Sequence, residues 1–543
     1  MKKALFIIIT LVCLQQNFSQ TPITATIPFQ GYDEPQAYLG EGEYQIFLDN
    51  TNGVLDKPII VIDGFDPNDG RDINGIYNTL NYDNTNIADQ LRSEGFDFVF
   101  LNFPTYTRPS DGVEVNGGAD FIQRNAMVLV ELISEINSQK VGNEELMFIA
   151  PSMGGLVSRY ALRYMEQNSM PHESSLYISW DAPHKGMNIP IEFQYLMNYI
   201  AEVNGGNADL QAVLASTFGS PASKQMMIDH FSAHLAGGST FEQDNAILLP
   251  IGATNFRDAF QLELDAMGFP QQTRNVCLAN GSSTGTMTGT PGMEILNHTF
   301  DVPDQPNLTI DIVLHFTPLA NQNIEVTSAI TYIEVFGTLV PLATFTANSQ
   351  SFSFTDGLDS AAGGKVDLQS LLGAAQDNPI LLELINNLQQ SEFCFMPTIS
   401  ALAIDNENDW YASVDIPTTH NSPFVAWHIP TVNETHLVMS TTGANFVMTE
   451  IRNQIASINN ASFGTMFKLS NNPVSTEINV ITNTNYNKLN VSIVSVTGQN
   501  LVSKQFTNVT NKINLPINLS NGIYFLKIAM DNKSYVKKIV VNK

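Results

Sequence analysis

Residues 145–167, ELMFIAPSMGGLVSRYALRYMEQ, change character at their centre. The first letters form a short apolar run typical of a buried strand, and the last part repeats apolar residues every three to four positions, as a helix does. The turn between them, PSMG, carries Ser152. Ala150 and Gly154 are small enough to leave room for a sharply bent backbone on either side of the serine. The stretch therefore predicts a strand, a tight turn and a helix in direct succession.

The surrounding sequence continues the alternation of strands and helices. Apolar runs at 58–64 (PIIVIDG) and 96–103 (FDFVFLNF) flank the helical stretch IADQLRSEG, and a long helical pattern covers 119–139. Alternating strands and helices favour an α/β fold with a mostly parallel central sheet. We expect this fold to extend over residues 20–469.

Ser152 is the candidate nucleophile, because such a bend exposes the hydroxyl above the sheet. The Met153 N–H at the start of the helix is placed to donate to a developing oxyanion, and Phe65 N–H, in the turn after the strand at 58–64, is the expected second donor. The alternatives are that Ser152 is an ordinary helix N-cap and that the turn at Phe65 only ends a strand.

A nucleophilic serine needs an imidazole to remove its proton, and His436 is the candidate base. It stands in NETH, ahead of a segment with helical spacing near the end of the predicted fold. His184, His420 and His428 are competitors, each with a structural interpretation.

The acid that would orient the histidine is the most open assignment. Asp181 follows the strand SLYISW in SWDAPHKG and is our first choice, with a turn-stabilising carboxylate as its alternative. Asp359 comes later in the chain and is the second choice. The remaining candidates are Asp356, Glu392 and Asp405.

The stretch APSMGGLVSRY resembles the serine-bearing turn of α/β-hydrolase lipases and esterases, although Ala150 stands where G-x-S-x-G has its first glycine. The resemblance covers most of residues 55–460. It implies cleavage of carboxylic esters through a Ser-His-Asp triad and an acyl-enzyme, with an ester or lipid substrate and no cofactor. Amide or thioester cleavage by the same groups, or an inactive secreted binding protein, are the alternatives.

Two insertions interrupt the predicted fold. Residues at about 187–272 have helical periodicity and are expected to form a cap, either a lid over an acyl pocket or helices that thicken the domain. Residues at about 283–355 include alternating runs typical of antiparallel strands and are expected to form a β-rich insertion.

Residues 470–543 differ from the rest of the chain, with eight lysines and only two acidic residues. Their alternating runs predict a small β-sandwich. NNPVSTEINV, VSIVSVTGQNLV, LSNGIYFLKI and KSYVKKIVVNK resemble the type A sorting domain of type IX secretion substrates. The resemblance implies the secretion machinery as a partner and release outside the cell or attachment to its surface. An accessory β-module is the alternative.

The first 19 residues, with Lys2, Lys3 and the run ALFIIITLVCL, predict a cleaved signal peptide, with a lipoprotein site at Cys13 as the weaker alternative. No later run is long enough to predict a transmembrane segment. A net charge of −28 argues against nucleic-acid binding. Cys277 and Cys394 permit at most one disulfide. Acidic and amide side chains at 66–72 fit no calcium loop, so we expect no metal.

Overall fold

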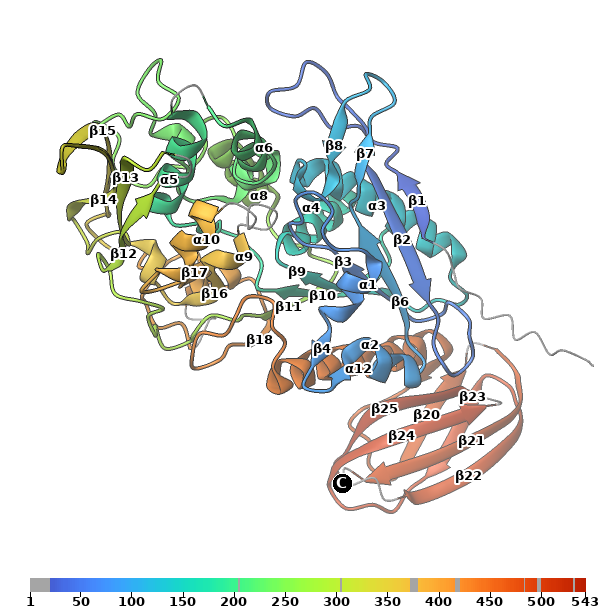
Figure 1. Cartoon of the computed structure of the whole chain (residues 1–543). Coiled ribbons are helices and arrows are strands. Elements are labelled where there is room, and N and C mark those ends of the chain that lie inside the picture. Colours follow the sequence, from blue (N-terminus) through green and yellow to red (C-terminus); the bar gives the residue numbers. More distant parts are fainter. Residues whose placement is uncertain are drawn as a thin grey trace, which may run out of the picture. The chain divides into compact units, whose positions relative to one another are not determined.

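The computed structural model describes residues 20–203, 206–302, 305–371, 379–415, 420–482, 484–495, 500–530 and 533–543 (Figure 1). The predicted signal peptide lies outside them. The chain forms two compact units, Met1–Phe446 and Val447–Lys543. Helix α12 (Thr441–Met466) contains the boundary between them.

The first unit is built on an eight-stranded sheet with the order β1-β2-β6-β3-β9-β10-β11-β18. Strand β2 pairs antiparallel with β1 and β6, and the strands from β6 to β18 are parallel to one another. The strands are β1 (Thr21–Thr24), β2 (Glu41–Phe47), β3 (Pro58–Ile62), β6 (Asp97–Asn102), β9 (Leu146–Pro151), β10 (Ser174–Trp180), β11 (Arg274–Leu278) and β18 (Ala426–His428).

Helices cover both faces of this sheet, since every residue of β3, β6 and β9 is buried. Helices α3 (Ile122–Gln139) and α4 (Met153–Gln167) pack on each other, and both contact the sheet, α4 at β9 and β10. Helices α1 (Ile73–Asn78) and α2 (Ile87–Ser93) contact β6. Two short hairpins join these elements, β4 (Asn81–Tyr82) with β5 (Thr85–Asn86) and β7 (Thr105–Thr107) with β8 (Glu114–Asn116).

Two large excursions leave the sheet after β10. Before β11 the chain forms helices α5 (Ile191–Glu202), α6 (Ala208–Ser216), α7 (Pro221–Met226) and α8 (Arg257–Met267). After β11 it forms a four-stranded antiparallel sheet of β12 (Glu294–Asp301), β13 (Leu308–His315), β14 (Asn323–Val335) and β15 (Thr338–Gln350), on which α5 packs (Figure 1).

The chain then returns to the central sheet through a two-stranded ribbon, β16 (Gly363–Asp367) paired with β17 (Glu392–Pro397). Helices α9 (Leu368–Leu371), α10 (Pro379–Asn386) and α11 (Thr398–Ala401) accompany it. Cys277 in β11 and Cys394 in β17 are both buried and both free, so neither forms a disulfide.

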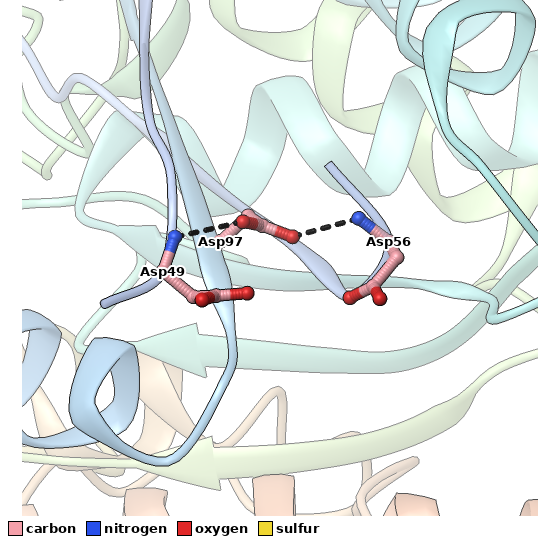
Figure 2. A group of neighbouring side chains, drawn as sticks. All are labelled: Asp49, Asp56 and Asp97. Atoms are coloured by element: carbon pink, nitrogen blue, oxygen red, sulfur yellow. Dashed lines mark hydrogen bonds between the residues drawn. The ribbon is translucent and has the colours of Figure 1, made fainter. Parts of the chain in front are cut away.

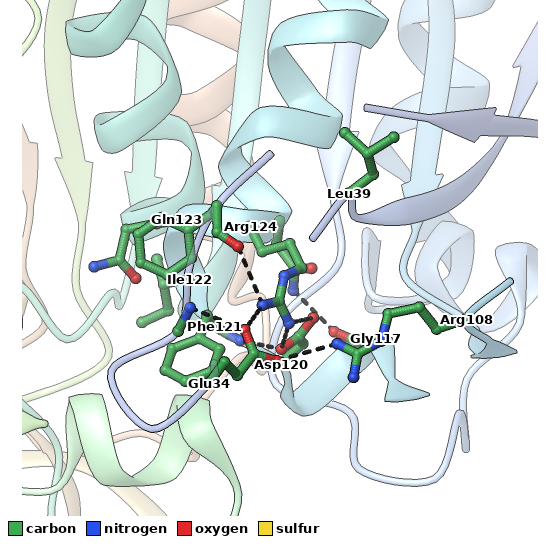
Figure 3. Close-up of polar contacts among 12 residues, drawn as sticks. Glu34, Leu39, Arg108, Gly117, Asp120, Phe121, Ile122, Gln123 and Arg124 are labelled. Carbon is green, nitrogen blue, oxygen red and sulfur yellow. Dashed lines mark hydrogen bonds and ion pairs between the residues drawn. The ribbon is translucent and has the colours of Figure 1, made fainter. Parts of the chain in front are cut away.

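A buried ion-pair network fixes the segment ahead of β2 to the start of α3 (Figure 3). Arg124 Nη1 lies 2.8 Å and 2.9 Å from the two carboxylate oxygens of Asp120. Glu34 forms an ion pair with Arg124 and another, at 3.2 Å, with Arg108. Since buried charges are costly unless paired, these four side chains hold the segment in one position.

The second unit contains two antiparallel sheets around its own core. One has the order β19-β20-β23 and the other β22-β21-β24-β25. The strands are β19 (Phe467–Leu469), β20 (Glu477–Thr482), β21 (Tyr486–Ser495), β22 (Asn500–Val509), β23 (Lys512–Pro516), β24 (Gly522–Met530) and β25 (Lys533–Val541). Buried Ile, Leu and Val side chains from both sheets form the core. The predicted fold class is confirmed, whereas the domain boundaries stay predictions.

Candidate active site

Ser152 occupies the turn between β9 and α4 with a backbone conformation that few non-glycine residues adopt, φ 49° and ψ −127°. Its N–H donates to the Trp180 carbonyl at 2.8 Å, which fixes the turn against β10. A Cβ on Gly154 would lie 2.9 Å from two backbone oxygens, so this position requires glycine. The Ser152 hydroxyl does not cap α4.

The hydroxyl of Ser152 faces His436 instead. His436 Nε2 lies 3.1 Å from Ser152 Oγ, although the two residues are 284 positions apart. The histidine follows β18 in a loop held by the β16 ribbon, because its N–H donates to the Lys365 carbonyl at 2.8 Å. The Phe395 ring packs on the imidazole with the centroids 4.9 Å apart.

Asp181 stands on the other side of the imidazole. Its Oδ2 atom lies 2.7 Å from His436 Nδ1, and its side chain is completely buried. The residue follows β10 directly and has a positive φ of 46°. A carboxylate at this nitrogen holds the imidazole with Nε2 directed at the serine.

Asn280, which the sequence analysis did not single out, joins these residues. Its backbone N–H donates to Asp181 Oδ1 at 3.0 Å, and its side-chain oxygen accepts the Leu437 N–H at 3.2 Å. Its side-chain amide donates to the Val438 carbonyl at 3.0 Å. Asn280 therefore fixes the aspartate and the histidine loop together. Its place two residues after β11 is the signal that could have identified it.

The turn after β3 approaches Ser152 closely. A Cβ on Gly64 would lie 3.3 Å from the Ser152 Cβ. No described acceptor binds the N–H of Phe65 or Met153, and both groups belong to segments beside the serine. Two such N–H groups can receive an oxyanion.

Arg71 holds this turn in place and was also not singled out from the sequence. Its Nε lies 3.1 Å from Asp63 Oδ1, and its Nη2 donates to the Phe65 carbonyl at 3.0 Å. Burial raises the pKa of Asp63 to about 6, although the charge of Arg71 acts in the opposite direction. The same ion pair raises the pKa of Arg71 against the effect of burial.

The other acids considered from the sequence lie elsewhere. Asp359 accepts hydrogen bonds from Asn188 Nδ2 at 2.9 Å and from the Thr317 N–H at 2.8 Å. Asp356 caps the Ala320 N–H, and Glu392 and Asp405 form ion pairs with Lys365 and Lys185. None of the four has a hydrogen bond to His436 among the described residues.

The other three histidines considered from the sequence contact groups other than Ser152. His184 Nε2 lies 2.8 Å from Ser179 Oγ, and burial brings the His184 pKa well below its ordinary value. His428 is part of β18, where burial lowers its pKa. The Asp405 N–H donates to the His420 carbonyl. Their contacts agree with structural interpretations.

The acidic loop at 66–72 is engaged by protein groups. Asp66 Oδ2 accepts the Arg71 N–H at 2.7 Å, and Asp72 caps α1 by accepting the Gly75 N–H. Asp69 Oδ1 accepts from the Asn102 side chain at 3.2 Å.

A cavity of about 490 Å³ opens beside Ser152 and His436. Apolar side chains from the helical excursion and the ribbon line much of it, namely Ile189, Val213, Phe218, Val366 and Phe395. A largely apolar pocket with a few polar groups at one end suits a ligand that has a hydrocarbon part and one polar reacting group.

Comparison with known proteins gives two family matches. Residues 57–208 match the family described as "Putative serine esterase (DUF676)". Residues 471–542 match the "Secretion system C-terminal sorting domain" family, which indicates export through type IX secretion to the cell surface or beyond. No curated protein matches the chain. Among the described residues, no helix combines the length and the apolar character that crossing a membrane requires.

Several solved structures are similar to the chain at low identity. A serine hydrolase without a lid from Xanthomonas campestris is 16% identical over 30% of this chain and 62% of its own, less than two thirds, with a TM-score of 0.20. Est1E from Butyrivibrio proteoclasticus is 10% identical over 44% and 72%, with a TM-score of 0.22. The peroxisomal α/β-hydrolase Lpx1 from Saccharomyces cerevisiae is 11% identical over 49% and 74%, with a TM-score of 0.26.

The order and directions of the sheet strands and the serine turn after β9 agree with the match of residues 57–208 to the serine esterase family. The chain thus combines an α/β-hydrolase fold, in which residues 57–208 are similar to a serine esterase family, with a C-terminal secretion-system sorting domain.

Proposed function

We propose that the protein is an exported serine hydrolase that cleaves carboxylic esters, a lipase or esterase. One observation carries the proposal. His436 bridges Ser152 and Asp181, with its Nε2 3.1 Å from the serine oxygen and its Nδ1 2.7 Å from the carboxylate. An imidazole so held can take the serine proton, which makes the alcohol a nucleophile.

The reaction proceeds in two stages. His436 Nε2 takes the proton as Ser152 Oγ bonds to the ester carbonyl carbon, and the Phe65 and Met153 N–H groups stabilise the negative oxygen. The C–O bond to the alcohol then breaks, and the alcohol leaves with the proton from His436. In the second stage His436 takes a proton from water, the hydroxide attacks the acyl carbon, and the carboxylic acid leaves as Ser152 regains its proton.

The apolar cavity favours an ester with a hydrocarbon acyl chain. Ile189, Val213 and Phe218 come from the segment at 187–272, which we propose as the cap. An amide or thioester of similar shape would contact the same groups, so assays with each substrate class are needed to identify the leaving group. We further propose that residues 1–19 are the signal peptide and that residues 470–543 direct export.

Hydrolysis of nitrophenyl esters of graded chain length by the full chain tests the catalytic proposal. Ser152→Ala and His436→Ala should each lower kcat by a factor of about 10⁴ or more. Ser158→Ala is the matched control, because this buried serine of α4 has no hydrogen-bond partner among the described residues. A fluorophosphonate should label Ser152 alone. An active Ser152→Ala variant would rule out this nucleophile, and a wild type without turnover on any ester would favour an inactive binding protein.

Export is tested separately by removing residues 470–543. The truncated chain should stay inside the outer membrane, with its esterase activity measurable in lysed cells. Normal appearance of the truncated enzyme in the medium would contradict the role of this segment.

A further inference from the structure

Three aspartates that no catalytic argument uses meet at one end of the central sheet (Figure 2). Asp49 lies just beyond β2, Asp56 just before β3, and Asp97 is the first residue of β6. One carboxylate oxygen from each lies within 4.8 Å of the others. Ser152, by contrast, follows the carboxyl end of β9, which is parallel to β3 and β6. The cluster is therefore at the opposite end of the strands from the candidate active site.

Backbone N–H groups hold the carboxylates of Asp97 and Asp49 in place, and the Asn52 side-chain amide donates to Asp56 Oδ2 at 3.0 Å. Asp97 Oδ1 accepts the Asp49 N–H at 2.9 Å, and Asp97 Oδ2 accepts the Asp56 N–H at 2.8 Å. Asp49 Oδ1 accepts three N–H groups of the loop that follows it, from Thr51 at 2.5 Å, Asn52 at 2.6 Å and Gly53 at 3.3 Å. Hydrogen bonds thus orient all three carboxylates, but at Asp49 and Asp56 they involve only one of the two oxygens.

Two oxygens remain without a partner. Asp49 Oδ2 and Asp56 Oδ1 are buried and have no hydrogen-bond donor among the described residues. Asp49 is only 6% exposed and Asp97 is fully buried. In Figure 2 the carboxylates of Asp49 and Asp56 point toward one another beneath that of Asp97. Unpartnered buried carboxylate oxygens are costly, which makes a missing positive partner the simplest explanation.

The protein supplies little positive charge to this cluster. Burial opposes the ionisation of Asp49, yet its three N–H donors and the charge of Lys57 hold its pKa below the ordinary value. Burial raises the pKa of Asp97. No ion pair joins Lys57, or any other described cation, to one of the three carboxylates at 4 Å or less.

We propose that Asp49, Asp56 and Asp97 form a calcium-binding site. Their oxygens supply three negative charges and no nitrogen or sulfur ligand, which suits a hard cation and not zinc. Asp56 is partly exposed, so water can complete the six to eight ligands that calcium takes. The bound ion joins the β2–β3 loop to the start of β6 and stabilises the sheet, without touching the candidate active site.

Isothermal titration calorimetry of the chelator-treated full chain with CaCl2 tests the site. A dissociation constant of about 10⁻⁴ to 10⁻³ M is expected, the range of extracellular calcium modules, with weaker binding of Mg²⁺. Asp49→Asn and Asp56→Asn each keep an oxygen for the existing hydrogen bonds and replace the unpartnered one with an amide nitrogen. Each should weaken calcium binding about tenfold or more. Asp258→Asn, an exposed position in α8, is the matched control.

Thermal unfolding separates a calcium site from a cluster that acts through hydrogen bonds alone. Calcium should raise the Tm of the wild type and of Asp258→Asn. It should raise the Tm of Asp49→Asn and Asp56→Asn much less, because a ligand stabilises the folded state only in proportion to its binding. The proposal is overturned if the wild type shows no saturable binding, if both variants bind calcium as it does, or if Mg²⁺ binds as tightly.

Discussion

Gly364 lies directly against the carboxylate of Asp181. A Cβ at Gly364 would stand 2.2 Å from Asp181 Oδ2, the oxygen that lies 2.7 Å from His436 Nδ1. The β16 ribbon therefore comes as close to the aspartate as a backbone without a side chain allows.

We expect Gly364→Ala to lower kcat about 100-fold, because the methyl group displaces the oxygen that orients His436. Turnover of a nitrophenyl ester and thermal unfolding should be measured together. Gly237→Ala is the control, since no atom lies within 4 Å of a Cβ there. Unchanged kcat in a folded Gly364→Ala variant would contradict the importance of this contact.

Replacement of the two candidate acids distinguishes their roles. Asp181→Asn should lower kcat by a factor of about 10² to 10⁴, since the amide no longer stabilises the protonated imidazole. Asp359→Asn should leave kcat within about threefold and act on stability instead, because Asp359 binds Thr317 and Asn188. A larger kcat loss in Asp359→Asn would reverse the assignment.

The sequence could propose Ser152 and Asp181, the latter as first choice among several acids, because each follows a predicted strand, and His436 because it lies near the end of the predicted fold. The carboxyl ends of parallel strands share one edge of a sheet, so residues at these places come together. Asn280 also comes shortly after a strand, β11, but the contacts of Asn280 and Gly364 could not be derived from the sequence. Their roles depend on the approach of a ribbon and a loop from distant parts of the chain, and neither residue type suggests chemistry.

The proposed calcium site could not be predicted from the sequence for the same reason. A calcium loop carries its ligands at short, regular spacing in one segment of the chain. Asp49, Asp56 and Asp97 belong to three strand ends, and only the order β2-β6-β3 in the sheet makes them neighbours.

Arg71 should influence the rate through the turn that carries Phe65. Arg71→Lys keeps the charge but loses the planar fork that reaches both Asp63 and the Phe65 carbonyl. We expect kcat to fall about tenfold or more with little change in KM, since the oxyanion is present only in the transition state. Arg163, whose Nε donates to the Met267 carbonyl on α8, provides the control. The Arg163→Lys variant should behave like the wild type. An increase in KM without a change in kcat would instead assign Arg71 to substrate binding.

Asp63 should make stability depend on pH. Its pKa of about 6 lies above the ordinary value of 3.8, so the folded protein holds this proton more tightly than the unfolded chain does. Its contribution to stability is therefore greatest below about pH 4 and is lost as the pH rises through 6. Relative to Asp63→Asn, the wild type should lose about 2 kcal/mol of unfolding free energy between pH 4 and pH 7. Denaturant titrations of both proteins that run parallel across this range would contradict the expectation.

The size of the cavity should set the acyl-chain preference. Val213→Trp places a large ring in the lining, so kcat/KM for long-chain nitrophenyl esters should fall about tenfold or more while that for the acetate changes little. Val141→Trp, at an exposed position outside the lining, is the control. An equal loss on all chain lengths would mean that the acyl group does not enter this cavity.

Cys277 and Cys394 bear on how the protein can be prepared. Burial raises the pKa of both thiols well above the ordinary value, so neither readily forms the thiolate that oxidants attack. The described fold owes nothing to a sulfur–sulfur bond. Production in a reducing cytoplasm, with dithiothreitol present throughout purification, should therefore yield the folded protein without help from oxidative folding catalysts.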